Sequence, residues 1–145
     1  NVNQEQKLKL IPKIQNYFNN ELKGKRIAVW GLAFKPETDD IREAPALYTI
    51  DNLLELGANI TAFDPEAMPN VKRKYGDKIK FSENMYNALE EADALVICTE
   101  WSIFRTPDFT KIKSKLSSAV IFDGRNLYDV NDVKNEGFTY LSIGR

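Results

Sequence analysis

Charged side chains gather in the stretch 31–45, which directly follows the apolar run 27–30. That run is typical of a strand buried on both faces, and Gly31 ends it where the backbone must turn tightly. In parallel sheets, the loops after the strand ends form the usual ligand-binding edge. The charged residues of this loop are Lys35, Asp39, Asp40, Arg42 and Glu43. A lysine can meet a diphosphate as a point charge, and an arginine can contact phosphate through two hydrogen bonds, so a function is sought here first.

The same loop lacks the glycines that a dinucleotide-binding fold uses. Such folds carry Gly-x-Gly-x-x-Gly after the first strand, whereas this chain has Gly31-Leu-Ala-Phe-Lys-Pro36. Two of the three glycines are missing, and they are what lets the backbone approach a pyrophosphate. We therefore expect that NAD is not cradled here in the standard way and that cationic side chains replace the glycine amides.

Each cation also has a purely structural interpretation. Lys35 can be a solvated loop lysine. Arg42 stands among acidic neighbours, so a local ion pair that orders the loop is at least as good an account as a ligand contact. Arg125 follows Asp123-Gly124 and can be an exposed arginine beside a turn.

Other residues near predicted strand ends carry similar alternatives. Asp64 stands where some dinucleotide folds bind a ribose, but the sequence Asp64-Pro-Glu66 favours the N-cap of a helix. Trp101 and Phe104 can belong to the core or wall a base. Cys98 follows an apolar run and has no histidine to activate it, so we interpret it as a buried structural thiol.

Strand and helix patterns alternate along the chain. The predicted strands are 27–30, 59–63, 78–81, 94–98, 119–122 and 139–143, and the predicted helices are 1–22, 43–56, 64–74, 82–91, 108–116 and 130–135. Pro12 is unfavourable inside the first helix, which is expected to start near Ile11 or to kink there. The pattern predicts an α/β fold with a doubly wound, Rossmann-like, mostly parallel sheet of five to six strands, flanking helices and a preceding N-terminal helix. Right-handed crossovers would bring loops 31–42, 64, 99–101 and 123–125 to one edge.

Composition narrows the functional classes. The chain has 145 residues, a formal net charge of -1, one cysteine and no histidine. The near-zero charge argues against nucleic acid as a partner, and the short apolar runs argue against a membrane span, so we expect a cytoplasmic protein. A conventional zinc cluster and histidine-based catalysis are not expected either. The first residue is Asn1 rather than methionine, which suggests a piece of a longer protein.

Four motifs in this order resemble the C-terminal UDP-sugar-binding domain of the UDP-glucose/GDP-mannose dehydrogenase family, in its UDP-glucose 6-dehydrogenase branch. They are Gly31-Leu-Ala-Phe-Lys-Pro-Glu-Thr-Asp-Asp-Ile-Arg-Glu-Ala-Pro45, Ala62-Phe-Asp-Pro-Glu-Ala67, Thr99-Glu-Trp-Ser-Ile-Phe104 and Val120-Ile-Phe-Asp-Gly-Arg-Asn-Leu-Tyr-Asp129. The resemblance covers about residues 24–145. It implies that residues 1–22 are the tail of a central linking and dimerisation helix and that residues 23–145 form the UDP-sugar-binding domain.

The resemblance also implies a reaction and a set of site residues. The reaction is the oxidation of UDP-glucose to UDP-glucuronate with reduction of two NAD, by a protein that forms a homodimer. By position, Phe34, Lys35 and Arg125 would contact the UDP-sugar. Arg42 would reach the NAD held mainly by an absent N-terminal domain. The family's Gly-Ser-Cys segment with its nucleophilic cysteine is missing, so no catalytic residue is expected and the chain alone is predicted to be inactive.

Two other interpretations stay open. The first is a dehydrogenase of another nucleotide sugar, UDP-N-acetylmannosamine or GDP-mannose. The second is a non-catalytic assembly module, because the apolar stripe of Leu10, Ile14 and Phe18 needs something to cover it.

Overall fold

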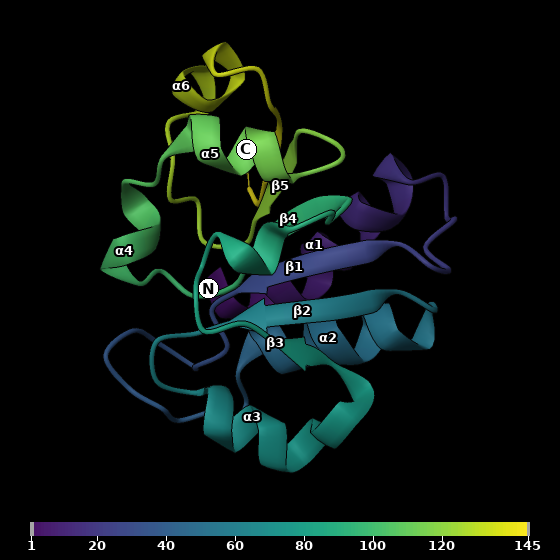
Figure 1. Ribbon diagram of the computed structural model, residues 1–145, viewed down its shortest axis with the longest axis vertical. Coiled ribbons are helices and arrows are strands. Elements are labelled where there is room, and N and C mark those ends of the chain that lie inside the picture. The colour runs from purple at the N-terminus through teal and green to yellow at the C-terminus, as the bar shows by residue number, and fades with distance from the viewer. Residues whose placement is uncertain (1, 145) are drawn as a thin grey trace.

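Six short strands form one parallel sheet in the computed structural model, which describes residues 2–144 (Figure 1). Asn1, the first residue of the predicted segment 1–22, and Arg145, the last residue of the predicted segment 23–145, lie outside the described residues. The strands are β1 Arg26–Trp30, β2 Asn59–Phe63, β3 Lys80–Phe81, β4 Ala94–Ile97, β5 Val120–Asp123 and β6 Thr139–Ser142. Their order is β3-β2-β1-β4-β5-β6, and every neighbouring pair is parallel. The predicted doubly wound sheet is therefore confirmed.

Helices cover both faces of this sheet. They are α1 Val2–Tyr17, α2 Pro45–Glu55, α3 Met68–Tyr75, α4 Ser102–Arg105, α5 Phe109–Lys115 and α6 Val130–Asn135, with short 3-10 turns η1 Gly76–Lys78 and η2 Asn87–Leu89. Side chains of β1 alternate between two cores, since Ile27 and Val29 pack with α1, α2 and α3, while Trp30 packs with α4, α5 and α6. Both faces of the central strands are buried, which explains why β1, β4 and β5 are continuous apolar runs rather than alternating ones.

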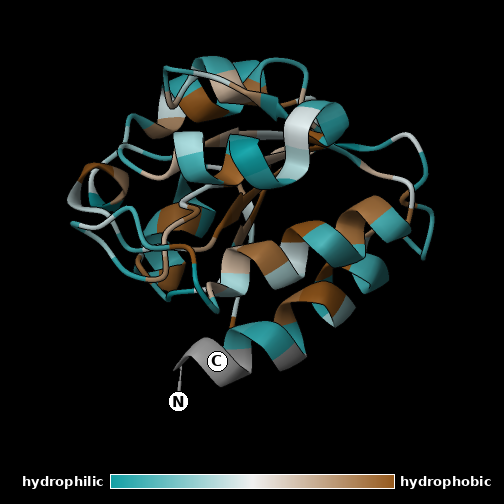
Figure 2. Cartoon of the chain, turned by 90° about the horizontal axis from the view of Figure 1, so that it is seen from below, coloured by the Kyte–Doolittle hydropathy of each residue, from teal (hydrophilic) through white to brown (hydrophobic). Residues whose placement is uncertain are grey.

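Helix α1 belongs to the core of this domain. The side chains of Leu10 and Ile14 are fully buried, and Phe18, just after the helix, packs against the same cluster. Helix α1 lies along α2 and reaches β5, and both α1 and α2 carry hydrophobic as well as hydrophilic residues (Figure 2). The apolar stripe that motivated an assembly module is thus covered from within the chain.

Two expectations for the first helix are wrong. The helix ends at Tyr17 rather than at residue 22, and it begins well before Ile11, which rules out the start near Ile11 that was given as the alternative to a kink there. Pro12 lies inside it with an exposed ring. The burial of Leu10, Ile11 and Ile14 around Pro12 accounts for this, because tertiary packing outweighs the local cost of one proline.

The segment 82–91 was expected to be a helix and forms only the 3-10 turn η2. Ser82 Oγ accepts a hydrogen bond from Asn84 N, and Asn84 Oδ1 accepts bonds from the amides of Tyr86 and Asn87. Short polar side chains that bind nearby backbone compete with helical hydrogen bonds. Conversely, helix α4 is present where no helix was predicted.

Candidate functional site

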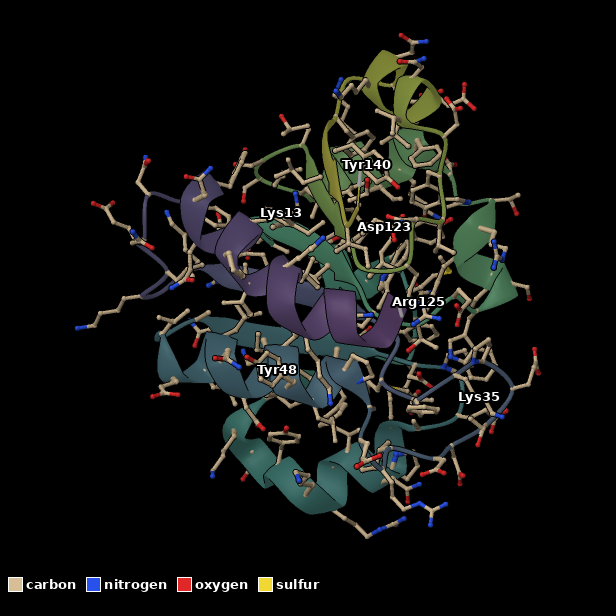
Figure 3. All side chains as sticks on the ribbon, turned by 180° about the vertical axis from the view of Figure 1, so that it is seen from behind. Lys13, Lys35, Tyr48, Asp123, Arg125 and Tyr140 are labelled. Atoms are coloured by element: carbon tan, nitrogen blue, oxygen red, sulfur yellow. The ribbon has the colours of Figure 1, made fainter. Side chains whose placement is uncertain are left out.

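Four loops meet at the carboxyl edge of the sheet, as the parallel topology requires. We call residues 98–101 after β4 and residues 124–127 after β5 the inner loops, and residues 32–44 after β1 the outer loop. The fourth loop follows β2 and begins at Asp64. In Figure 3, Arg125 of an inner loop and Lys35 of the outer loop lie on the same side of the molecule. Lys35 stands farther out, on a loop that extends away from the sheet.

Arg125 is held by Glu100 of the other inner loop. Its Nε donates to Glu100 Oε2 at 2.9 Å, and its Nη2 donates to the same oxygen. The two side chains are only 14% and 21% exposed, so this ion pair is partly shielded from solvent. Arg125 is therefore an oriented guanidinium at a strand end, and the alternative of a freely exposed arginine is wrong. Glu100 was not predicted as a site residue, although its charge opposite to that of Arg125 at a neighbouring strand end was a usable signal.

A buried aspartate sets the backbone of the Arg125 loop. Asp123 is fully buried, and its Oδ1 accepts from Arg125 N at 2.8 Å. Its Oδ2 accepts from Leu127 N at 2.7 Å and from the Tyr140 hydroxyl at 2.6 Å. Figure 3 shows Tyr140 above Asp123, with Arg125 below it. A carboxylate that receives several hydrogen bonds fixes the turn that carries the guanidinium.

A second buried aspartate ties three strand-end loops together. Asp64 Oδ2 accepts from Leu32 N at 2.7 Å, Ala33 N at 3.1 Å and Trp101 Nε1 at 3.2 Å. Its Oδ1 accepts at 2.8 Å from each of the amides of residues 66 and 67. The residue before α3 is Ala67, so the prediction of Asp64 as an N-cap is wrong. With five donors around it, the carboxylate has no capacity left for ribose hydroxyls.

Gly31 is required by the packing of two loops. Its φ is +94°, and a Cβ built on it would lie 2.6 Å from both Cβ and N of Thr99. The Thr99 hydroxyl donates to Ala33 O at 2.8 Å, which joins the outer loop to an inner loop. The absence of a side chain at Gly31 therefore lets the loops after β1 and β4 pack closely against each other.

The three predicted residues of the outer loop are exposed. Phe34 is 36% exposed, and the side chain of Lys35 points to solvent. The Arg42 side chain is 88% exposed and donates from Nε and Nη2 to the two oxygens of Asp40, at 3.0 and 2.8 Å. The hydrogen bonds from Arg42 lower the pKa of Asp40 to about 2. The local ion pair suggested for Arg42 is thus present.

Cys98 and the two aromatic residues belong to the interior. Burial raises the pKa of the Cys98 thiol to about 12. The nucleophilic form of cysteine is the thiolate, so this residue is inert at neutral pH, which confirms the structural interpretation. Trp101 and Phe104 are 5% and 0% exposed, and Phe104 stacks on Trp30 with ring centroids 5.0 Å apart. They form core rather than the wall of a base site.

Gln6 on helix α1 touches both inner loops and was not predicted. Its side chain is fully buried, and Nε2 donates to Cys98 O and Gly124 O at 3.2 Å each. Its Oε1 has no hydrogen-bond partner among the described residues. A buried acceptor without a partner costs about 1–3 kcal/mol. Gln6 precedes Leu10 and Ile14 at four-residue steps, and this spacing was the available sequence signal.

Two surface hollows lie outside the inner loops. One, of about 590 Å³, is at the amino ends of β1 and β2, where Arg26 pairs with Glu91. The other, of about 460 Å³, lies beside Arg42 and is also lined by Ile41, Leu47 and Tyr48. Neither of these two hollows is lined by Arg125 or Lys35.

The residues present do not fit a dinucleotide at the loop after β1. The only glycine in Gly31-Leu-Ala-Phe-Lys-Pro36 faces Thr99, and Asp64 is saturated by protein donors. Within the described residues, no group of three or more His, Cys, Asp or Glu side chains could hold a metal ion. None of the described helices is long and apolar enough to cross a membrane.

The parallel sheet, its strand order and the charged carboxyl edge define a Rossmann-like nucleotide-binding module. Residues 28–130 match the model of the UDP-glucose/GDP-mannose dehydrogenase family, UDP binding domain. The chain belongs to this family.

Relatives agree with this assignment. The chain is 42% identical to the UDP-glucose 6-dehydrogenase of Rhizobium meliloti (strain 1021) over 144 residues, which are 99% of the chain and 33% of that protein. The UDP-glucose dehydrogenase from Pyrobaculum islandicum superposes with a TM-score of 0.75 at 26% identity, over 97% of the chain and 29% of that protein. An NDP-N-acetyl-D-galactosaminuronic acid dehydrogenase from Methanosarcina mazei Go1 superposes with a TM-score of 0.77 at 27% identity, over 96% of the chain and 28% of that protein. The chain thus spans about a third of the length of its curated relatives.

Proposed function

We propose that residues 23–145 form the UDP-sugar-binding domain of an NAD-dependent UDP-glucose 6-dehydrogenase, with Phe34, Lys35 and Arg125 at the UDP-sugar. The observation that carries the proposal is Arg125, an arginine oriented by Glu100 at the carboxyl edge of a sheet whose family is that of UDP-binding domains. An arginine with a fixed fork of donors suits a diphosphate, and the exposed Lys35 adds a second positive charge.

The whole reaction needs parts that this chain does not supply. In the proposal the parent protein is a cytoplasmic homodimer, and residues 1–22 are the end of its central helix. NAD would be held mainly by another domain, and Arg42, whose side chain is 88% exposed, would contact it. NAD would serve as the hydride acceptor. The buried Cys98 supplies no nucleophile, so this chain alone is expected to bind UDP-sugar and to catalyse no turnover.

Binding of UDP tests the proposal directly. Titration of the folded chain with UDP or UDP-glucose should release heat, and Arg125→Ala should weaken UDP binding by about 1.5–3 kcal/mol, or roughly 10- to 150-fold. The matched control is Arg26→Ala, because Arg26 also pairs with a carboxylate but at the opposite edge of the sheet. Unchanged affinity in Arg125→Ala would remove this arginine from the site.

A second candidate is the dehydrogenase of another nucleotide sugar, and the likeness to the Methanosarcina mazei structure favours testing it. The proposal of UDP-glucose rests on the higher identity to the curated UDP-glucose 6-dehydrogenases. Turnover of UDP-glucose, UDP-N-acetylmannosamine and GDP-mannose by the full-length protein separates these activities. Preference for either of the last two would overturn the choice of sugar while leaving the UDP-domain assignment testable by UDP binding.

A further inference from the structure

The amide of Gln6 bridges the ends of two neighbouring strands. Helix α1 runs across the sheet with its first turns at the carboxyl edge (Figure 1), and Figure 3 shows Arg125 beside that end of the helix. From there Gln6 Nε2 donates to Cys98 O after β4 and to Gly124 O after β5, at 3.2 Å each. One fully buried side chain thus binds the backbone of both inner loops at their first residues.

Gly124 has no side chain, and the Gln6 side chain occupies the space that a Cβ there would fill. A Cβ on Gly124 would lie 2.8 Å from both Cγ and Cδ of Gln6 and 3.0 Å from Ile97 O. Unlike most glycines of the chain, Gly124 does not have a positive φ, so its backbone conformation would admit other residues. What excludes a side chain here is therefore the presence of Gln6 and of the β4 strand end.

The two backbone positions bound by Gln6 lie at the base of the Glu100–Arg125 pair. Gly124 directly precedes Arg125, and Cys98 lies two residues before Glu100. We propose that Gln6 is a positioning residue that fixes the Arg125 guanidinium for the diphosphate of a nucleoside diphosphate, so that the seating of helix α1 sets nucleotide affinity. This inference rests on the proposed function, in which Arg125 contacts that ligand.

The first test removes the amide and keeps the bulk. Gln6→Met has a similar length and no donor, so it should raise the dissociation constant for UDP by about 3- to 10-fold, because binding must then also order the loop that carries Arg125. The ¹H–¹⁵N signal of Arg125 Nε, which reports the bond to Glu100, should shift as well. The control is Gln15→Met on the same helix, which should change UDP affinity less than about 2-fold and leave that signal in place.

The decisive test asks whether Gln6 acts through Arg125. In an Arg125→Ala background, Gln6→Met should cause no further loss of UDP affinity, because the group that it positions is gone. An equal loss in both backgrounds would mean that Gln6 supports the fold in general, and the inference would be overturned. All measurements are made where denaturation curves show each variant to be folded.

Gly124→Ala tests the same inference by changing the residue that Gln6 contacts instead of Gln6 itself. Its added methyl group should displace Gln6, weaken UDP binding and shift the Arg125 Nε signal, again with no further loss of affinity in the Arg125→Ala background. If Arg125→Ala weakens binding while Gln6→Met and Gly124→Ala bind UDP like the parent chain, the inference fails and the proposed function stands. If Arg125→Ala itself binds like the parent, the proposed site fails.

Discussion

The inner loops and the outer loop meet at one edge of the sheet but are held by different interactions. Buried groups fix the inner loops, since Asp123 and Gln6 bind their backbone, Tyr140 donates to Asp123, and Glu100 holds Arg125. In the outer loop, the bonds to the buried Asp64 and Thr99 lie near its start, and the contacts farther along include exposed ones, such as Asn70 Nδ2 to Asp39 O. The orientation of Arg125 is therefore set by the fold before a ligand arrives. Lys35 keeps the side-chain freedom of a surface residue, and Arg42 is held only by its exposed pair with Asp40.

This difference predicts that substitutions at buried anchors lower stability, whereas those at exposed cations act on binding alone. Asp64→Asn is expected to have the largest effect. An amide nitrogen cannot accept, so two or more of the five donors around residue 64 would lose their partner. We expect a loss of about 3 kcal/mol in the free energy of unfolding, measured by chemical denaturation.

The control for this variant is Asp39→Asn, at an exposed carboxylate of the outer loop. Asp39→Asn should change the free energy of unfolding by less than about 0.5 kcal/mol. A loss below about 1 kcal/mol in Asp64→Asn would show that water or rearranged loops satisfy the freed donors, and would weaken the contrast between anchored and exposed residues.

Tyr140→Phe should have an intermediate effect. It removes the hydroxyl that donates to Asp123 Oδ2 at 2.6 Å, a hydrogen bond to a buried carboxylate. Bonds to charged groups contribute about 1.5–3 kcal/mol, and we expect a loss near the lower end of this range in thermal or chemical unfolding. Tyr48→Phe is the matched control, because Tyr48 is 43% exposed and should change stability by less than about 0.5 kcal/mol. Equal losses in the two variants would contradict the anchoring role of Asp123.

Sequence patterns located β1, β4 and β5 because each is an apolar run bounded by polar residues, and both of its faces are buried. They failed at Ser82 and Asn84, where side-chain bonds to the backbone replace a helix. Parallel topology placed Arg125 and Lys35 at the correct edge. Local sequence cannot show which side chains meet across it.

The role of Asp64 illustrates this limit. The local sequence Asp64-Pro-Glu66 favours a helix cap, yet three of its five donors come from residues 31 to 37 positions away. Gln6 is more distant still, because it binds Gly124 across 118 positions of sequence. Such contacts depend on how whole elements pack, so the buried anchors at this edge could not be predicted, whereas the position of the cations at the edge could.

Lys35→Ala should leave stability within about 0.5 kcal/mol of the parent chain, since its side chain is exposed. Its proposed contact with the diphosphate predicts a UDP affinity about 3- to 10-fold lower, less than the effect of Arg125→Ala because an exposed lysine must first be ordered. Lys78→Ala, at an exposed lysine on the opposite edge, is the control for calorimetric titration. An effect larger than that of Arg125→Ala would reverse the expected ranking of the two loops.

The smallest effect concerns pH and the pair of Arg42 with Asp40. The pKa of Asp40 is about 2 in the folded chain, below its ordinary value of 3.8, because Arg42 donates to its carboxylate. A lowered folded-state pKa contributes stability above the ordinary value, and this contribution is lost as the pH falls through about 2. Since the pair is exposed, the change should be local, seen as the Arg42 Nε and Asp40 carboxyl signals titrating together in NMR spectra. In Arg42→Ala the Asp40 midpoint should rise toward 3.8, and a midpoint that does not move would show that the outer loop owes its conformation to other contacts.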